Sequence, residues 1–359
     1  MAASAPPPPR FILRGHEGAC NCVAFQSESL LISGDVTGEL RIWDLEARTT
    51  HTRLRAAHAH SILSVSRMPA GDAHQFLSCS RDGTVKLWSA ATGQAALTLQ
   101  TQAHCFCNAS PDRASGSSAD AHLVLTAAAD ESTVQLWDLR TGQVAAKATL
   151  AKHLGLVSVL HLHSAPHSQT GSGDSAPAAF LCALVGCDGG SVSMLDMRAA
   201  GAGGGTRSPL CTTAAVHDMQ PVLAMDVAPT GRDVVTGGAS MQVQRCELSM
   251  PSREGSWAGA EVAMGDSLTL PVAGTSGVAY RCDGRLCASG HWDGTVRLVE
   301  ASAKGLKPLA ILRHAGQGKE SIFGVTFGLT GTASRGFFAS ASKDGTIALW
   351  DLYADRMRE

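Results

Sequence analysis

The fold of this chain is decided by one stretch, Ser80-Arg81-Asp82-Gly83-Thr84-Val85-Lys86-Leu87-Trp88. Asp-Gly is a favoured pair in tight turns whose two central residues both take a positive φ. After the turn, apolar and polar side chains alternate up to Trp88, which is the period of a β-strand. The stretch therefore predicts the end of one strand, a tight turn and a second strand.

The same pattern recurs along the whole chain. Strong copies lie at 129–138, 291–299 and 342–351, and weaker copies at 35–44, 188–196 and 240–248. In the other six copies, the position equivalent to Trp88 is residue 43, 137, 195, 246, 299 or 350. A unit of this length is typical of one four-stranded propeller blade. Seven copies predict an all-β fold, a seven-bladed β-propeller.

The spacing between copies exceeds a minimal blade where the sequence is rich in Gly, Ala, Ser and Pro. We interpret these segments as loop insertions within one domain: 111–120, 164–179, 199–209 and 250–265. The last copy ends at Asp351, which leaves too few residues for an outer strand. The alternating segment 10–14 can supply that strand and close the ring, which removes an open sheet edge. We expect a Pro-rich lead-in at 1–9, one propeller at 10–353 and a short tail at 354–359.

The repeat resembles the WD40 repeat. In WD40 blades, a histidine before the blade, a Ser or Thr, the turn Asp and the Trp form a buried hydrogen-bonded chain. Histidines precede six copies, at positions 16, 58, 104, 153, 217 and 314. We expect structural roles for a set of blade residues: His16, Trp43, Asp44, His58, Asp82, Trp88, Asp130, Trp137, Asp293, His314, Asp344 and Trp350. Blade four lacks the Trp, blade five the turn Asp and the Trp, and blade six the His and the Trp, so these three blades are expected to be the least stable.

Composition excludes several classes of function. The chain is 44% hydrophobic and 17% charged, with a net charge of -2, and lacks the concentrated basic face that direct nucleic-acid binding needs. No segment approaches the ~20 apolar residues that span a bilayer, and the first ten residues do not resemble a secretory signal. Eleven cysteines, an odd number, favour reduced thiols and a nuclear or cytoplasmic location rather than secretion.

Candidate catalytic or metal sites are weak. We interpret Cys20-Asn21-Cys22 and Cys105-Phe106-Cys107 as core residues that share a strand face, because structural zinc sites use a wider spacing. We interpret the histidines at 161, 163 and 167 as polar loop residues rather than as metal ligands. No phosphate-binding loop or nucleophile elbow is present in the sequence. We therefore expect no enzyme activity and no cofactor.

Three residues are candidates for partner binding. Trp137-Asp138-Leu139-Arg140 and Leu195-Asp196-Met197-Arg198 place Arg140 and Arg198 after the Trp-Asp position of neighbouring blades. This pair resembles the boxes of WD40 substrate receptors of cullin-RING ubiquitin ligases, although an Arg is also frequent there in ordinary blades. Trp257, isolated in the segment 250–265, is either a contact residue or a plug against blade five.

Three segments resemble one WD40 family in particular, that of guanine nucleotide-binding protein subunit beta-like protein 1, called ASTRA-associated protein 1 in fungi. They are Pro6–Pro9 followed by Phe11–Gly15, Ala288–Asp293 with Lys307–Leu312, and Ser342–Asp344 with Leu349–Tyr353. The resemblance implies a subunit of the chromatin-linked ASTRA complex, associated with the co-chaperone machinery that matures phosphatidylinositol-3-kinase-related kinases. We expect no Gγ-type partner, because ten residues before Phe11 leave no room for the coiled-coil helix of true Gβ subunits. A ligase substrate receptor is the alternative.

Overall fold

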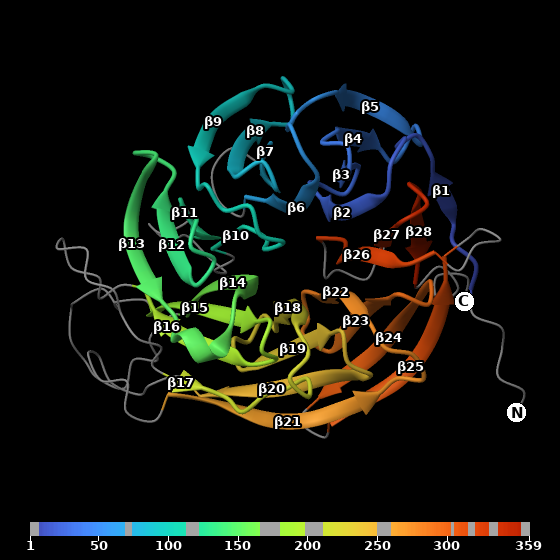
Figure 1. The fold of residues 1–359 in the computed structure, drawn as a ribbon. Helices are drawn as coiled ribbons and strands as arrows, with labels where there is room; N and C mark the ends of the chain where they lie inside the picture. The colour runs from blue at the N-terminus through green and yellow to red at the C-terminus, as the bar shows by residue number, and fades with distance from the viewer. Residues whose placement is uncertain are drawn as a thin grey trace, which may run out of the picture.

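The computed structural model describes residues 7–68, 74–112, 122–165, 180–197, 211–249, 260–302, 305–314, 320–329 and 337–352. These residues form seven four-stranded antiparallel sheets. Figure 1 shows the sheets as the blades of a ring, with β2, β6, β10, β14, β18, β22 and β26 nearest its centre. The predicted all-β, seven-bladed propeller is confirmed.

Each blade runs from an inner strand to an outer strand in chain order, apart from the last. Blades one to three comprise β2 Cys20–Phe25, β3 Leu30–Asp35, β4 Leu40–Asp44 and β5 Thr49–Leu54; β6 Ile62–Arg67, β7 Gln75–Ser80, β8 Thr84–Ser89 and β9 Ala95–Gln100; and β10 Ser110–Pro111, β11 Leu123–Ala127, β12 Thr133–Asp138 and β13 Gln143–Thr149. Blades four and five comprise β14 Val157–Ala165, β15 Phe180–Cys187, β16 Val192–Asp196 and β17 Cys211–Thr212; and β18 Val222–Val227, β19 Asp233–Gly238, β20 Gln242–Ser249 and β21 Glu261–Thr269. Blades six and seven comprise β22 Thr275–Tyr280, β23 Leu286–His291, β24 Thr295–Ser302 and β25 Gly305–Arg313; and β26 Ile322–Phe327, β27 Phe337–Ser342, β28 Ile347–Asp351 and β1 Phe11–Leu13.

The N-terminal strand closes the ring, as the sequence predicts. β1 pairs with β28 in the register Phe11↔Leu349 and Leu13↔Ile347. The Leu13 side chain is buried in a core cluster that blades seven and one share. Arg10 adds an ion pair with Asp351 at 3.0 Å. Closure therefore joins the two ends of the chain through backbone hydrogen bonds and apolar packing.

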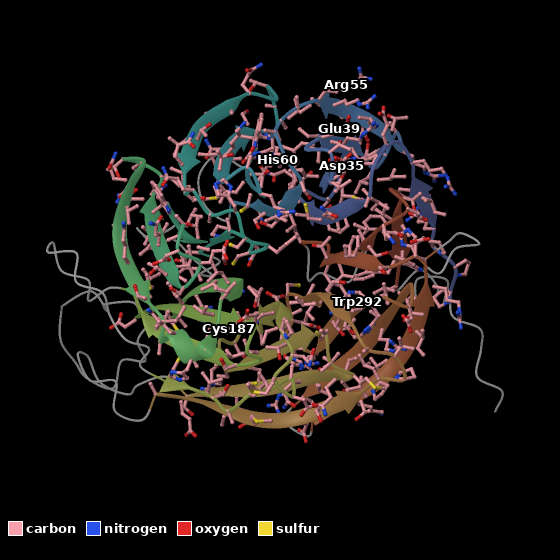
Figure 2. All side chains as sticks on the ribbon, in the orientation of Figure 1. Asp35, Glu39, Arg55, His60, Cys187 and Trp292 are labelled. Atoms are coloured by element: carbon pink, nitrogen blue, oxygen red, sulfur yellow. The ribbon has the colours of Figure 1, made fainter. Side chains whose placement is uncertain are left out.

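The turn between the second and third strands differs from the predicted geometry. Gly83 has φ +79° and donates its N–H to the Ser80 carbonyl at 3.2 Å, while Asp82 is absent from the described residues with positive φ. This matches a three-residue hairpin loop in which only the last residue is left-handed. A Cβ at Gly83 would lie 2.9 Å from the His104 ring. The turn therefore needs glycine for its φ and for space. Figure 2 labels Asp35, Cys187 and Trp292 at or beside the equivalent turns of three blades around the ring.

Strands extend into three of the segments that we interpreted as loop insertions. Pro111 belongs to β10, Ser164 and Ala165 belong to β14, and 261–265 belong to β21. The insertions are therefore shorter than their composition suggests. One 3-10 helix, Lys152–Leu154, lies among the described residues, and no helix in that part of the chain is long and apolar enough to cross a membrane.

Candidate protein-binding surface

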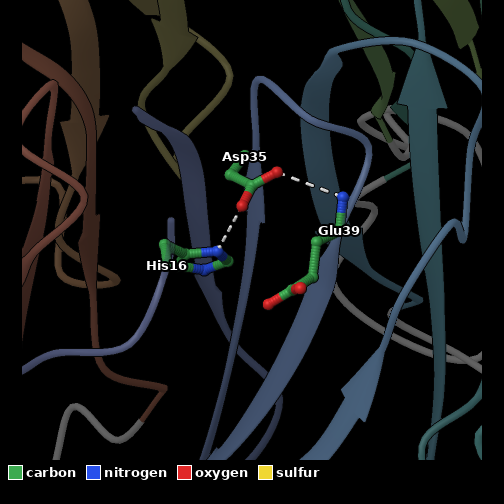
Figure 3. A group of neighbouring side chains, drawn as sticks. All are labelled: His16, Asp35 and Glu39. Carbon is green, nitrogen blue, oxygen red and sulfur yellow. Dashed lines mark hydrogen bonds and ion pairs between the residues drawn. The ribbon is translucent and has the colours of Figure 1, made fainter. Parts of the chain in front are cut away.

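Blade one holds a complete chain of buried polar contacts (Figure 3). His16 contacts Asp35 through Nδ1 at 2.8 Å and Ser33 through Nε2 at 2.6 Å. The Trp43 indole donates to the same Ser33 hydroxyl at 2.8 Å. Because that oxygen accepts from the indole, its own proton is free to donate to Nε2, which leaves Nδ1–H to donate to Asp35. Every polar group of the chain is thus paired without water.

Blade two repeats this chain. His58 contacts Asp82 at 2.9 Å and Ser78 at 2.6 Å, and Trp88 donates to Ser78 at 2.8 Å. Burial lowers the pKa of His58, so the ring is neutral at physiological pH. Burial alone would raise the pKa of Asp82, but hydrogen bonds from Thr84 and the charge and hydrogen bond of His58 hold it at about 2. The chain is therefore a neutral histidine against an ionised carboxylate.

Asp44, the other aspartate of blade one, has a separate role. It ends β4, and its Oδ1 accepts the backbone N–H groups of Glu46 and Ala47 at 2.8 and 2.9 Å. It therefore shapes the turn to the outer strand rather than contacting His16. The turn carboxylate of this blade is Asp35.

Blades three and four do not bury the histidine that precedes them, contrary to the WD40 pattern. His104 is exposed and, among the described residues, forms a hydrogen bond with the Arg81 carbonyl alone, at 3.1 Å. His153 is also exposed, because the 3-10 helix Lys152–Leu154 buries Leu154 instead. In blade three the Trp137 indole still donates to Thr126 at 3.0 Å. Asp130 of the same blade accepts from Thr133, through the backbone N–H at 2.9 Å and the hydroxyl at 2.7 Å.

Blade five keeps its histidine and replaces the aspartate. His217 is fully buried and contacts Thr236 at 3.0 Å and Ser240 at 2.9 Å. Ser240 stands where Asp82 stands in blade two, so a hydroxyl takes the place of a carboxylate. Burial lowers the pKa of His217 to about 4.

Blade six corrects a further expectation, because it does have a buried histidine. His291, the last residue of β23, contacts Ser289 at 2.8 Å and Thr275 at 3.1 Å. It reaches the polar chain from the strand rather than from the preceding loop. Asp293 in the following turn accepts from Thr295. His291 thus supplies the histidine that blade six lacks in its preceding loop, while the lower stability of blades four to six stays a prediction.

Blade seven has a modified chain. His314 contacts Ser340 and Thr346, each at 2.8 Å. Asp344 accepts the backbone N–H and the hydroxyl of Thr346 at 2.9 and 2.6 Å. The buried Trp350 indole N–H has no hydrogen-bond partner in the part of the chain that the structure describes.

One cluster has the composition of a metal site. The side chains of His16, Asp35 and Glu39 lie close together (Figure 3). However, His16 is bonded to Asp35, and Glu39 is held by Arg41 at 2.5 Å and by Arg53 at 2.7 Å. These two guanidinium groups already neutralise the carboxylate charge that a bound cation would need. We interpret the cluster as part of the structural chain of blade one.

Contrary to expectation, neither C-x-C pair places its two side chains on one face of a strand. A β-bulge between Cys20 and Cys22 sends the two side chains into different core clusters. Cys105 and Cys107 lie in the loop before β10 and pack in one core cluster. A hydrogen bond from Cys107 lowers the pKa of Cys105 to about 7, and burial raises that of Cys107. These pairs serve inter-blade packing.

The histidines at 161 and 163 lie on β14, not on a loop, while His167 lies outside the described residues. His161 lines the central channel, which has a volume of about 480 Å³. Its Nδ1 is 3.6 Å from Asp226 of blade five, which also accepts the Tyr280 backbone N–H at 2.7 Å. These contacts join blades four, five and six around the channel.

Of the three predicted partner-binding residues, the structure describes one. Arg140 is exposed, and its guanidinium contacts both carboxylate oxygens of Asp138 at 2.7 to 3.2 Å. Arg198 and Trp257 lie outside the described residues. The paired-box hypothesis therefore stays a prediction.

The loops before the inner strands and the turns between the second and third strands share one face, which we call the turn face. Backbone hydrogen bonds join turn to loop at Val36–Ala19, Arg81–Ser61, Asp188–Leu156, Ala239–Pro221, Trp292–Gly274 and Lys343–Ser321. Large exposed apolar residues gather here, among them Val36, Phe106, Leu156, Met219, Met241, Val272 and Trp292. Sequence reasoning missed this surface. One available signal was Trp292, which stands in the turn where Arg81 and Lys343 stand in other blades.

Comparisons with known families match the geometry. The model of the WD domain, G-beta repeat, matches residues 8–44, 50–89, 270–300 and 307–351. These segments fall in blades one, two, six and seven. The β-propeller domain of Cps50 (Swd1) from Myceliophteria thermophila aligns with a TM-score of 0.71 at 17% identity, covering 97% of this chain and 100% of that one.

Two curated relatives match across almost the whole length. Guanine nucleotide-binding protein subunit beta-like protein 1 of Mus musculus is 27% identical over 98% of this chain and 99% of its own. ASTRA-associated protein 1 of Verticillium alfalfae is 26% identical over 97% of this chain and 93% of its own. The chain thus carries WD40 repeats over these four segments, and it is a seven-bladed propeller similar throughout its length to those two proteins.

Proposed function

We propose that this protein is a non-catalytic scaffold, a subunit of the chromatin-linked ASTRA complex that associates with the co-chaperone machinery maturing phosphatidylinositol-3-kinase-related kinases. The observation that carries the proposal is the similarity to ASTRA-associated protein 1, which extends over 97% of the chain rather than over single repeats. A WD40 propeller is a protein-binding architecture. The proposal places the protein in the nucleus or the cytoplasm, wherever these partners are.

The contacts of the reactive residue types support a scaffold. His16, His58 and their carboxylates are bonded to each other inside blades one and two. His217 and His291 are buried with lowered pKa values of about 4 and are bonded to hydroxyls. Groups held in this way stabilise blades and are closed to a substrate. Binding through exposed turns on a stable ring is the activity that such an arrangement favours.

The net charge of -2 also bears on how partners are recognised. Long-range steering requires a strong field of one sign, which this composition does not supply. Recognition by shape and by a few buried apolar anchors is the mode that remains. The proposal therefore includes no direct nucleic-acid or membrane partner.

Affinity purification of the full-length chain with quantitative mass spectrometry tests the proposal. We expect ASTRA subunits and kinase-maturation co-chaperones in near-stoichiometric amounts, and Arg140→Ala is expected to leave their recovery unchanged. Recovery of a cullin-RING ligase adaptor instead, lost in an Arg140→Ala, Arg198→Ala double variant, would overturn the proposal in favour of the substrate-receptor alternative.

A further inference from the structure

Four large apolar side chains lie exposed on the turn face of blades five and six. They are Met219, Met241, Val272 and Trp292, with exposed fractions of 69, 46, 47 and 42%. We propose that this apolar arc binds an amphipathic α-helix of a partner protein. The inference rests on the proposed scaffold function and assigns its surface.

Backbone hydrogen bonds make the arc continuous. The loop that carries Met219 is joined to the turn of blade five, since the Ala239 N–H donates to the Pro221 carbonyl at 3.2 Å. The loop that carries Val272 is joined to the same turn through the Met241 carbonyl, which accepts from Leu270 at 2.8 Å. The arc is therefore one surface and not four separate side chains.

The turn of blade six joins the same surface. The Gly274 N–H donates to the Ser240 carbonyl of blade five at 3.2 Å, and the Trp292 N–H donates to the Gly274 carbonyl at 3.1 Å. Figure 2 labels Trp292 on a different part of the ring from Arg55 and His60. The arc thus occupies one side of the turn face.

Trp292 is held in place before any partner binds. A Cβ at Gly274 would lie 2.1 Å from Cδ2 of the indole, so the ring packs directly on the glycine backbone, whose φ is +100°. The Trp292 carbonyl accepts the Ser321 hydroxyl at 3.2 Å. An aromatic ring that is fixed in the free protein loses little conformational entropy on binding. Tryptophan is also enriched among the residues that dominate interface energies.

Met219 is presented by an unfavourable backbone. Its φ is +61°, a left-handed conformation that costs a non-glycine residue free energy. The neighbouring Asp218 is also left-handed, with φ +47°. The Gln220 N–H donates to the His217 carbonyl at 2.7 Å, which holds this turn above the buried histidine. A strained turn that exposes a long apolar side chain is best explained by a contact which that side chain makes.

Charge is absent along the arc and present at its ends. The other exposed residues of these loops and turns between Met219 and Trp292 are Gln220 and Pro271, both uncharged. Asp218 flanks the arc at the blade-four end, whereas at the other end Lys343 is paired with Glu320 at 3.6 Å and Asp293 is paired with Arg297 at 3.1 Å. A helix dipole is positive at its N-terminus and negative at its C-terminus. The charge of Asp218 favours a helix whose N-terminus lies near this residue.

The backbone of the arc favours a helix over an extended strand. Strand addition requires free backbone N–H and C=O groups at an edge. Here the Met241 carbonyl, the Trp292 N–H and the Trp292 carbonyl already have partners within the chain. A partner whose own backbone hydrogen bonds are satisfied, and which contributes only side chains, fits this surface. An amphipathic helix with apolar residues three and four apart is such a partner.

Matched control positions lie on the outer strands of the same two blades. Met264 on β21 and Leu309 on β25 are exposed by 52 and 51%, comparable to the arc residues. They lie outside the loops and turns that form the arc. Substitutions there match those in the arc for residue type and exposure.

Site-specific photo-crosslinking tests the proposal in the full-length chain. The photo-reactive residue p-benzoyl-phenylalanine replaces Met241 or Val272 in the arc, and Met264 or Leu309 as controls. We expect the arc positions to crosslink to one partner segment with apolar residues at three- and four-residue spacing, and the control positions not to reach it. Crosslinks from the arc to a second copy of this chain, to a segment of alternating apolar residues, or to no protein would overturn the proposal.

A synthetic peptide of the crosslinked segment then gives the energetics. It is expected to gain helical circular dichroism on binding the wild-type chain. Trp292→Ala should weaken its affinity about 30-fold, Met219→Ser should weaken it severalfold, and Met264→Ser and Leu309→Ser should change it less than about twofold. Binding without gain of helix, or wild-type affinity in both arc variants, would contradict the proposal. Melting temperatures of the variants check that each is folded, and Met219→Ser carries the test if Trp292→Ala is not.

The proposed surface and the proposed function can fail separately. If the crosslinked helix belongs to a protein outside the ASTRA and kinase-maturation set, the arc stands and the function falls. If those subunits co-purify in wild-type amounts with the folded Trp292→Ala, Met219→Ser double variant, the function stands and the arc falls.

Discussion

Lowering the pH from 7 to 4.5 is expected to destabilise this propeller steeply. Burial lowers the pKa of His217, His291 and His314 to about 4 in the folded protein. In the unfolded chain, histidine titrates near 6.5. Between these values the unfolded state binds more protons, so folding stability falls as the pH falls. Each of the three contributes about 1.4 kcal/mol per pH unit, which gives a slope of about 4 kcal/mol per unit.

Urea denaturation at a series of pH values measures this slope. His291→Gln should lower the slope by about 1.4 kcal/mol per pH unit, besides its constant cost in stability, because one of the titrating groups is gone. His60→Gln is the matched control, since His60 is exposed on the turn face, and it should change the free energy of unfolding by less than about 0.5 kcal/mol. A free energy of unfolding that is flat between pH 6.5 and 4.5 would show that these histidines are not buried as neutral groups.

Deleting residues 1–14 is expected to lower the melting temperature by roughly 5 °C or more. The deletion removes β1 and its pairing with β28. It also uncovers the core position that the Leu13 side chain fills, which is only 2% exposed in the folded protein. Loss of a buried leucine alone costs about 2–5 kcal/mol, and a change of 1 kcal/mol shifts the midpoint of a domain of this size by about 1.5 °C. The unpaired edge of β28 is also expected to promote aggregation.

The matched control is deletion of residues 1–9, which keeps β1 and the Arg10–Asp351 ion pair. Differential scanning calorimetry should find this shorter truncation within a few degrees of the full chain. Equal melting temperatures for the two truncations would mean that β1 does not stabilise the ring.

The repeat predicts the fold from sequence because each blade carries its own turn and its own alternating strand. The turn at Asp82-Gly83 and the strand up to Trp88 are local signals, and seven copies in series leave one architecture that can pair all of them. Closure by β1 could also be predicted, because the last copy of the repeat lacks an outer strand and residues 10–14 can supply it. These features depend on short stretches of sequence, which is why they could be predicted.

The polar chains could not be predicted in every blade, because burial of a histidine depends on the path of its loop. His58 and His153 both stand four residues before the inner strand of their blade, yet only His58 is buried. The 3-10 helix at Lys152–Leu154 turns Leu154 inward instead. In blade six, His291 takes the place of the missing loop histidine from another element. That a side chain from another element fills such a position becomes visible only when the strands are placed side by side.

The candidate binding surface also could not be predicted from the sequence. Trp292 and Met219 lie about 70 residues apart in the chain, and the backbone contacts of two loops and two turns bring them onto one arc. Periodicity reports which residues face the core of a blade. It does not report which turns of neighbouring blades combine into one exposed surface.

Depletion of the protein from cells tests the central claim most directly. The account predicts that the steady-state amounts of phosphatidylinositol-3-kinase-related kinases fall while their transcripts stay constant, and that re-expression of the wild-type chain restores them. Normal kinase amounts after complete depletion would contradict it.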